Sequence, residues 1–233
     1  MRHKLLFFLL FITGAIFAQN LQLHFDTRHS LYENQLSPSN YLTATFELFK
    51  PDKFGSTFMF VDFDFNHDNG NIGLAYAEIA RDFKVGDFPL MPHIEYNGGL
   101  GLVKGTDFGF SIPNAYLAGV SYSFPAGNFF VNTYAAYKLN AFEKTSHDVQ
   151  WTLVWESAFA CNRLSFNGFL DIYTENKDKA GAASGKQIVF LSEPQIWYNF
   201  TPHFSVGSEV EFSYNFLGNR LYTIPTLGVK WVL

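Results

Sequence analysis

The sequence contains a single cysteine, Cys161, among 233 residues. One thiol excludes a disulfide within the chain and any zinc site built from several cysteines. Charged residues are also scarce, at 16%, and no segment rich in lysine or arginine occurs. With a formal net charge of −5, the chain lacks the basic surface that binding to nucleic-acid phosphates requires. A nucleic-acid binder of the usual kind is therefore excluded.

Long apolar runs are missing beyond the N-terminus. After residue 18, no stretch reaches the roughly 18 apolar residues that indicate a membrane-spanning helix. The N-terminus itself has basic residues at positions 2–4, followed by an apolar stretch from Leu5 to Ala18. A basic segment before a short apolar one is typical of a secretory signal peptide. We expect residues 1–18 to be this peptide and residues 19–233 to form one exported domain.

Aromatic residues are abundant, with 28 Phe, 12 Tyr and 4 Trp. This apolar surface excludes intrinsic disorder, because a disordered chain has too little of it to offset the entropy of folding. Apolar and polar residues alternate, as at Leu21, Leu23 and Phe25 around Gln22 and His24. A period of two predicts β-strands with two unlike faces. The same alternation recurs at 42–48, 59–65, 93–97, 149–156, 164–173, 204–213 and 226–233.

Turn signals separate these segments. Their number predicts about twelve strands of roughly 10 to 13 residues, the length that crosses a bilayer at a tilt. An even number of strands returns both chain ends to the same side. The odd-numbered connections tend to be longer than the even-numbered ones, as expected when short turns face the periplasm and longer loops face outward. No linker or shift in composition interrupts the series.

The amount of polar surface decides between a membrane barrel and a soluble one. Acidic residues recur on the polar face of strand after strand, at Glu47, Asp62, Asp64, Glu95, Glu156, Asp171, Glu193, Glu209 and Glu211. A barrel of this width is too wide for side chains alone to fill, so a wet, polar interior leaves no carboxylate buried without a partner. The sequence therefore predicts an all-β fold, a transmembrane antiparallel up-and-down β-barrel in the bacterial outer membrane. A soluble sandwich or barrel is the alternative.

The predicted inner wall contains aromatic and ionisable side chains. We expect the pore to be lined, and a solute to be bound, by Phe58, Phe60, Asp62, Asp64, His93, Glu95, Glu156, Asp171, Glu193, Glu209, Glu211 and Lys230. Aromatic rings stack on planar groups, and carboxylates accept hydrogen bonds from hydroxyls. A mostly acidic lining favours neutral or cationic solutes. Each carboxylate also fits a simpler interpretation, a solvated wall residue or one paired with His24, His93, Arg81, Lys138 or Lys230.

Enzyme and metal signatures are weak. An outer-membrane hydrolase is a less favoured alternative. His203 and Ser205 share one strand face, but catalysis needs a base in contact with its nucleophile and a third group that orients the base. The segment 64–70 resembles the start of a calcium loop, yet Asn69 replaces the required glycine, so a polar hairpin loop explains it better. We expect no enzyme activity, no metal and no cofactor.

Several segments resemble a known family. Residues 40–55 and 58–62 are similar to the second hairpin of the Tsx-like nucleoside-specific channel-forming proteins. Residues 78–83, 115–119, 131–138 and 190–198 resemble a Bacteroidota-type branch of that superfamily. The resemblance implies a monomeric, twelve-strand outer-membrane channel with a narrow lumen, in contact with lipid outside and holding a nucleoside inside. Leu233 departs from the terminal Phe or Trp usual in such barrels.

A second functional hypothesis remains open at this point. The barrel would then be a structural or adhesion protein, in which loops such as 176–185 bind a partner.

Overall fold

The computed structural model describes residues 18–33, 35–180 and 184–233. The predicted signal peptide lies outside the described residues, except for Ala18, which begins the first strand. The strands are β1 (Ala18–Asp26), β2 (Tyr41–Asp52), β3 (Gly55–Asp64), β4 (Leu74–Phe83), β5 (Leu90–Leu102), β6 (Gly109–Ala126), β7 (Phe129–Asn140), β8 (Ser146–Phe159), β9 (Leu164–Asn176), β10 (Lys186–Ser192), β11 (Gln195–Asn199), β12 (Phe204–Tyr214) and β13 (Leu221–Val232).

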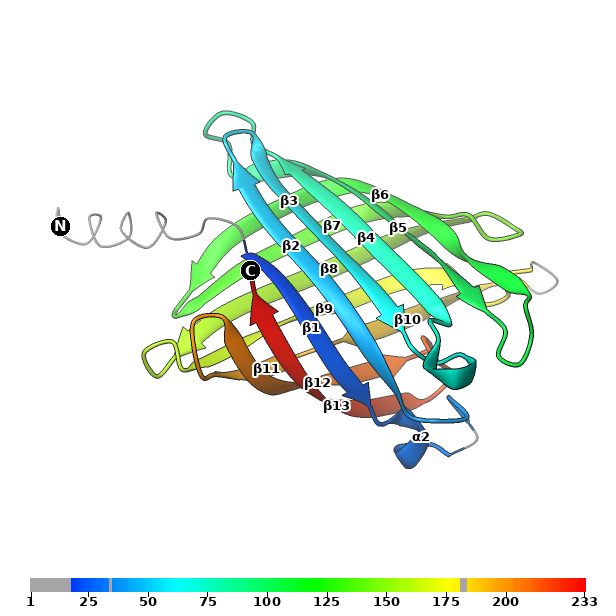
Figure 1. The fold of residues 1–233 in the computed structure, drawn as a ribbon. Helices are drawn as coiled ribbons and strands as arrows, with labels where there is room; N and C mark the ends of the chain where they lie inside the picture. Colours follow the sequence, from blue (N-terminus) through cyan, green and yellow to red (C-terminus); the bar gives the residue numbers. More distant parts are fainter. Residues whose placement is uncertain (1–17, 34, 181–183) are drawn as a thin grey trace, which may run out of the picture.

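All of these strands belong to one antiparallel sheet that closes on itself, because β13 pairs with both β12 and β1. The strands β10 and β11 are two halves of one strand, since each pairs with both β9 and β12. Thirteen segments therefore occupy 13 − 1 = 12 positions around the barrel. Figure 1 shows the closed barrel, and the prediction of an up-and-down barrel of about twelve strands is confirmed.

The break between β10 and β11 falls at Glu193 and Pro194. A proline has no backbone N–H and interrupts the ladder of hydrogen bonds. The neighbouring bonds persist: the Glu193 N–H donates to the Phe169 carbonyl at 3.1 Å, and the Val210 N–H donates to the Pro194 carbonyl at 3.0 Å. The register therefore continues across the break, and residues on either side keep the faces that the alternation gives them.

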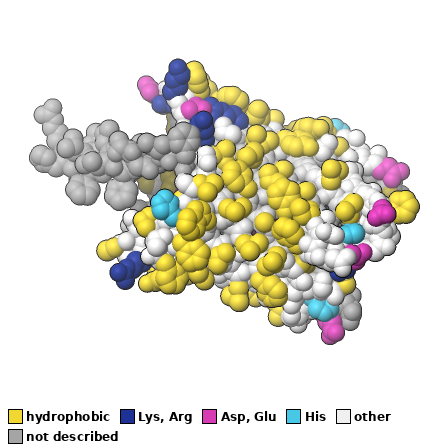
Figure 2. All heavy atoms as spheres, in the orientation of Figure 1, with side chains coloured by type: hydrophobic (Ala, Val, Ile, Leu, Met, Phe, Trp, Pro, Cys, Tyr) yellow, Lys and Arg dark blue, Asp and Glu magenta, His cyan; other side chains and the backbone are white. Residues whose placement is uncertain are grey.

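The outer face of the barrel is apolar. Leu21 and Phe25 on β1, with Leu227 and Trp231 on β13, point outward and are 49%, 44%, 70% and 51% exposed. In Figure 2, apolar side chains cover the middle of the visible wall, and the charged side chains gather toward its two ends. Such a band suits contact with lipid tails and would be unfavourable in water.

The start of β1 and the C-terminus lie at the same end of the barrel (Figure 1). The connections at that end span 53–54, 84–89, 127–128, 160–163 and 200–203. Those at the opposite end span 27–40, 65–73, 103–108, 141–145, 177–185 and 215–220, and are longer on the whole. By this asymmetry the termini face the periplasm and the long connections face outward.

The loops contain two short helical turns that the alternation did not predict, α2 (Arg28–Leu31) and η1 (Asp68–Gly70). Each is too short to show a helical period in the sequence. No helix in the described ranges has the length and apolar character needed to span a membrane.

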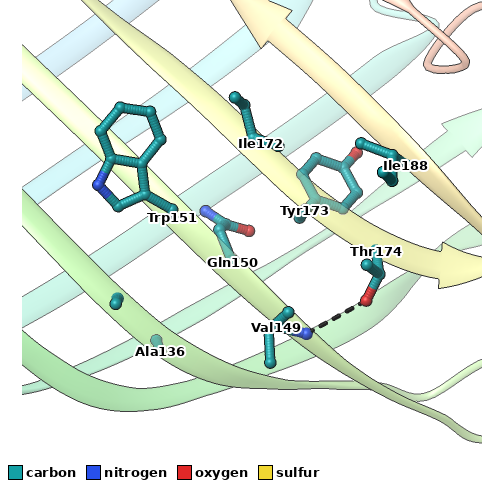
Figure 3. Close-up of a pocket in the computed structure, with 9 residues that line it drawn as sticks. Ala136, Val149, Gln150, Trp151, Ile172, Tyr173, Thr174 and Ile188 are labelled. Atoms are coloured by element: carbon teal, nitrogen blue, oxygen red, sulfur yellow. Dashed lines mark hydrogen bonds between the residues drawn. The ribbon is translucent and has the colours of Figure 1, made fainter.

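The outer wall has a shallow apolar hollow of about 440 Å³ across β7 to β10 (Figure 3). Its outward-facing lining includes Ala135, Val149, Trp151, Ile172 and Ile188. The hollow arises because Ala135 is much smaller than the surrounding side chains. It lies on the lipid side of the wall and is separate from the lumen described below.

Candidate functional site in the barrel lumen

The strand register places all twelve predicted lining residues on the inner face. The first four are alternate residues of β3, with Asp62 opposite Thr45 on β2 and Asp64 opposite Thr43. The others are His93 and Glu95 on β5, Glu156 on β8, Asp171 on β9, Glu193 between β10 and β11, Glu209 and Glu211 on β12, and Lys230 on β13. Alternation alone was enough to assign these residues to one face.

The side chains of the inner face differ in solvent exposure. Partly exposed ones lie mainly on β2 to β4 and on β9 to β12, and they include Phe58, Phe60, Asp62, Asp171 and Glu209. Buried ones lie mainly on β1 and on β5 to β8. Because the barrel is closed, an inward side chain can meet water only through the lumen. The described structure therefore has a lumen whose accessible walls are two opposed groups of strands.

Carboxylates from opposite walls interact electrostatically across this lumen. Asp62, on β3, interacts electrostatically with Glu193 and Glu209 on the far wall. Glu193 and Glu211 occupy facing positions on neighbouring strands, since the register runs through Ser192–Phe212 and Gln195–Glu209. We name Asp62, Glu193, Glu209 and Glu211 the acidic constriction. Its carboxylates accept hydrogen bonds from neutral groups: Thr45 donates to Asp62 at 2.5 Å, and Gln195 donates to Glu209 at 2.6 Å.

A second group of charges surrounds Lys138 on β7. Its ammonium group donates to the Gln150 Oε1 atom at 2.7 Å and stands 3.7 Å from the centre of the Tyr173 ring. The carboxylates that act on it electrostatically are Asp171, Glu78, Glu95 and Glu175. Glu78 accepts a hydrogen bond from the Tyr76 hydroxyl at 2.6 Å. We name Tyr76, Glu78, Glu95, Lys138, Asp171 and Tyr173 the Lys138 cluster.

A network of hydrogen bonds ties this cluster to the wall at His93. The ring nitrogens of His93 lie 2.8 Å from Asp82 Oδ1 and 3.2 Å from Glu95 Oε2. The Tyr134 hydroxyl donates to the same Glu95 oxygen at 2.7 Å, and its ring stacks on His93 at 4.0 Å. This stack spans β6, where Gly119 faces His93 and has no side chain to intervene.

Nearer the periplasmic end, Lys230 lies over the Trp197 ring, 4.5 Å from its centre. Trp197 is fully buried, and His24 packs against its edge at 5.5 Å. Lys230 interacts electrostatically with Glu47 and Glu156. Lys230 therefore lies on β13 toward the periplasmic end of the lumen, beside Glu47 and Glu156.

At the outer mouth, Arg28 and Tyr32 from the connection after β1 contact the barrel rim. The Arg28 guanidinium lies 2.8 Å from Asp26 and 3.5 Å from Glu211. Burial by itself would lower the pKa of Arg28, but nearby Tyr41, Asp26 and Glu211 outweigh it, and the pKa stays above its ordinary value. The Tyr32 hydroxyl donates to the Thr223 carbonyl at 3.2 Å, which anchors the connection to β13.

Two expected partners of the carboxylates have other roles. Arg81 faces outward and binds Asp52 and Thr57, so it lies outside the lumen. His24 lies 2.9 Å from Thr226 and 2.8 Å from Gln22, and the Asp26 carboxylate acts on it electrostatically. Alternation along β4 gives Arg81 the face opposite to that of Asp82, whereas for His24 it gives the face but not the partner on a neighbouring strand.

Several lumen residues lie outside the predicted lining: Tyr76, Glu78, Tyr134, Tyr173 and Gln150. Glu78 shows why, since it lies in a strand rich in alanine whose polar and apolar faces differ little. The signal available in the sequence was the even spacing of Tyr76 and Glu78 from Asp82, which places these three side chains on the same face of β4.

The suspected catalytic pair does not assemble. His203 lies 2.9 Å from the Val232 carbonyl, whereas Ser205 donates to Asn199. These two residues therefore form no contact between a nucleophile and its base. Within the described ranges, no group of three or more histidine, cysteine or acidic side chains is placed to hold a metal ion.

A closed antiparallel barrel with an apolar exterior and a polar, water-accessible lumen is a transmembrane β-barrel of the bacterial outer membrane. The chain belongs to the DUF5020 family, a domain of unknown function, which matches residues 18–233.

The fold is similar to that of the NanC porin, and a second porin matches less closely. The NanC porin matches with a TM-score of 0.58 and 12% identity, over 93% of this chain and 100% of that chain. The KdgM porin matches with a TM-score of 0.49 and 8% identity, over 93% of this chain and 99% of that chain. No curated protein matches the sequence.

Proposed function

We propose that this barrel is an outer-membrane channel for the passive diffusion of small neutral or cationic solutes. The observation that carries the proposal is the partly exposed acidic constriction, in which Asp62 faces Glu193 and Glu209 across the lumen. The resemblance of the fold to the NanC porin agrees with a channel.

The sign of the lumen charge decides which solutes pass. Among the described inner residues, carboxylates recur on nearly every wall, whereas the cations near the lumen are few, chiefly Arg28, Lys138 and Lys230. In a medium of low effective dielectric constant, fixed charges act on a passing ion much more strongly than in bulk water. An anion entering the constriction would meet unbalanced negative charge, and a cation or a neutral solute would not be repelled.

Nucleosides are the particular neutral solutes that we propose. The rings of Phe58 and Phe60 lie 6.1 Å apart, and Tyr76 continues the series 6.0 Å from Phe60. Asp62 follows on the same strand face, and Glu78 is opposite Phe60. Aromatic rings beside carboxylates suit a solute with a planar base and a hydroxylated sugar. The resemblance to Tsx-like channels suggests the same class.

Two measurements test the proposal. Purified protein in planar bilayers under a KCl gradient should give single-channel currents with a reversal potential that indicates preference for K⁺ over Cl⁻. Liposomes containing the protein should swell faster in adenosine or uridine than in a disaccharide of higher mass. Preference for Cl⁻ would refute the acidic lumen as the selective element, whereas equal swelling in nucleosides and in unrelated sugars of similar size would remove only the nucleoside assignment.

A further inference from the structure

One arginine reaches the inner face of the barrel from the first outer connection. Arg28 begins the short helix α2, two residues after β1 ends at Asp26. Its guanidinium lies 2.8 Å from the Asp26 carboxylate on β1 and 3.5 Å from the Glu211 carboxylate on β12. Both carboxylates belong to the inner face of the barrel. Because β13 lies between β1 and β12, the guanidinium spans the inner side of β13 at the outer mouth.

Several contacts fix the position of this guanidinium. The Arg28 Nε atom donates to both oxygens of Asp26, at 3.0 and 2.9 Å, and the Arg28 backbone N–H donates to Asp26 Oδ1 at 2.8 Å. The guanidinium also lies over the ring of Tyr41 on β2, 5.3 Å from its centre. The side chain of Arg28 is 19% exposed, so solutes at the mouth of the lumen can approach it.

The carboxylates at this end of the lumen lie at two depths. Three of them interact electrostatically with the guanidinium and with one another, and we name them the outer acids: Asp26, Asp64 and Glu211. Asp62 and Glu209 lie deeper, each two residues closer to the periplasmic end on β3 and β12, and interact with each other. A solute that enters from outside therefore passes Arg28 and the outer acids first.

The charge of Arg28 does not depend on the surroundings in the way that a carboxylate's does. A guanidinium stays protonated at any pH of the external medium, so Arg28 is a permanent positive charge beside the passage. It repels cations and attracts anions at the mouth, whereas the deeper carboxylates act in the opposite sense. The ion preference of the channel is then the balance between these two groups.

The other lumen cations are placed differently. Lys138 is only 7% exposed and is enclosed by its cluster, and Lys230 lies toward the periplasmic end. Of these three cations, Arg28 is the one that an entering ion meets at the outer mouth.

We propose that Arg28 is a selectivity-determining residue of the channel, which limits the cation preference that the lumen acids produce. This inference rests on the proposed channel function and assigns to it a second charged group. With Arg28 in place, the outer acids attract fewer counter-ions to the mouth. A neutral solute then has fewer ions to displace before it reaches the rings of Phe58 and Phe60.

The test is the reversal potential of the purified protein in planar bilayers under a tenfold KCl gradient. Arg28→Gln should raise the K⁺ to Cl⁻ permeability ratio about four-fold, for an ion that passes about 10 Å from the guanidinium at the dielectric constant of water. Arg28→Lys keeps the positive charge and should stay near the wild-type ratio, although it loses the forked hydrogen bonds. Combining Arg28→Gln with Asp26→Asn removes one charge of each sign and should return the ratio toward the wild-type value.

Lys144→Gln is the matched control. It removes the same charge at the same end of the barrel, in the exposed connection 141–145 away from β1 and β12, and should leave the ratio unchanged because water and salt screen an exposed charge. Heat-modifiable gel mobility confirms that each variant is folded.

Three results would overturn the inference. The folded Arg28→Gln channel could keep the wild-type ratio or show a lower one, or the double variant could keep the raised ratio. Arg28→Lys could also shift the ratio as far as Arg28→Gln does, which would assign the effect to lost contacts and not to charge. A wild-type protein that carries no current would defeat the proposed channel itself, and this inference with it.

Discussion

The acidic constriction gives the most direct prediction, that Asp62→Asn combined with Glu209→Gln weakens cation preference. Both substitutions keep shape and hydrogen-bonding ability while removing two negative charges from facing walls. At about 6 Å, one unit charge acts on an ion by roughly 0.7 kcal/mol at the dielectric constant of water and roughly 2.8 kcal/mol at an effective value near 20. Because the same charge attracts K⁺ and repels Cl⁻, each neutralised carboxylate should lower the K⁺ to Cl⁻ permeability ratio by about 10-fold at the dielectric constant of water, and by more at the lower value, before screening by salt.

The assay is the reversal potential in a tenfold KCl gradient, measured for the wild type, each single variant and the double variant. The shift toward zero should shrink at 1 M salt, where the Debye length is about 3 Å. Heat-modifiable gel mobility confirms that each variant is folded. A permeability ratio that stays unchanged in the folded double variant would show that these carboxylates do not control the passage of ions, and the argument from lumen charge would fail.

Three further predictions concern the structure around the lumen. Trp197→Ala should lower the free energy of unfolding by about 3–5 kcal/mol, because it removes a fully buried ring and leaves a cavity. Urea titration in lipid vesicles measures this free energy, and a loss under about 1 kcal/mol would contradict tight packing around the ring. Tyr32→Ala should release the connection between β1 and β2 from β13, because both hydrogen bonds with Thr223 and the ring contact with Tyr222 at 5.1 Å are lost. An added protease should then cleave this connection faster, and an unchanged cleavage rate would show that other contacts hold it. Arg81→Ala should leave stability and selectivity unchanged, because its ion pair with Asp52 is exposed on the outer face; a shifted reversal potential would contradict that position.

Much of the barrel follows from a local pattern. The alternation at Leu21, Leu23 and Phe25 marks an outer face, and the same parity assigned Asp62 and Asp64 to the inner one. This works because successive side chains of a strand always point to opposite sides, whatever its neighbours are. Turn signals then gave the approximate strand number and the position of the long connections.

Contacts within the lumen were beyond the reach of this pattern. Asp62 meets Glu193 and Glu209 only because closure brings β3 opposite β10 to β12. Likewise His93 meets Tyr134 across Gly119, and Arg81 points away from the lumen although its charge alone suited it to pair with an acid there. Such pairings depend on register and on the circumference of the barrel.

The sequence by itself determined that the chain forms strands with one apolar and one acidic face, because that information is carried by neighbouring residues. The tertiary structure decided which acids interact with one another and which of them lie near Lys138 and Lys230. Those outcomes follow from closing the sheet into a barrel, which sets distances between residues that are far apart along the chain.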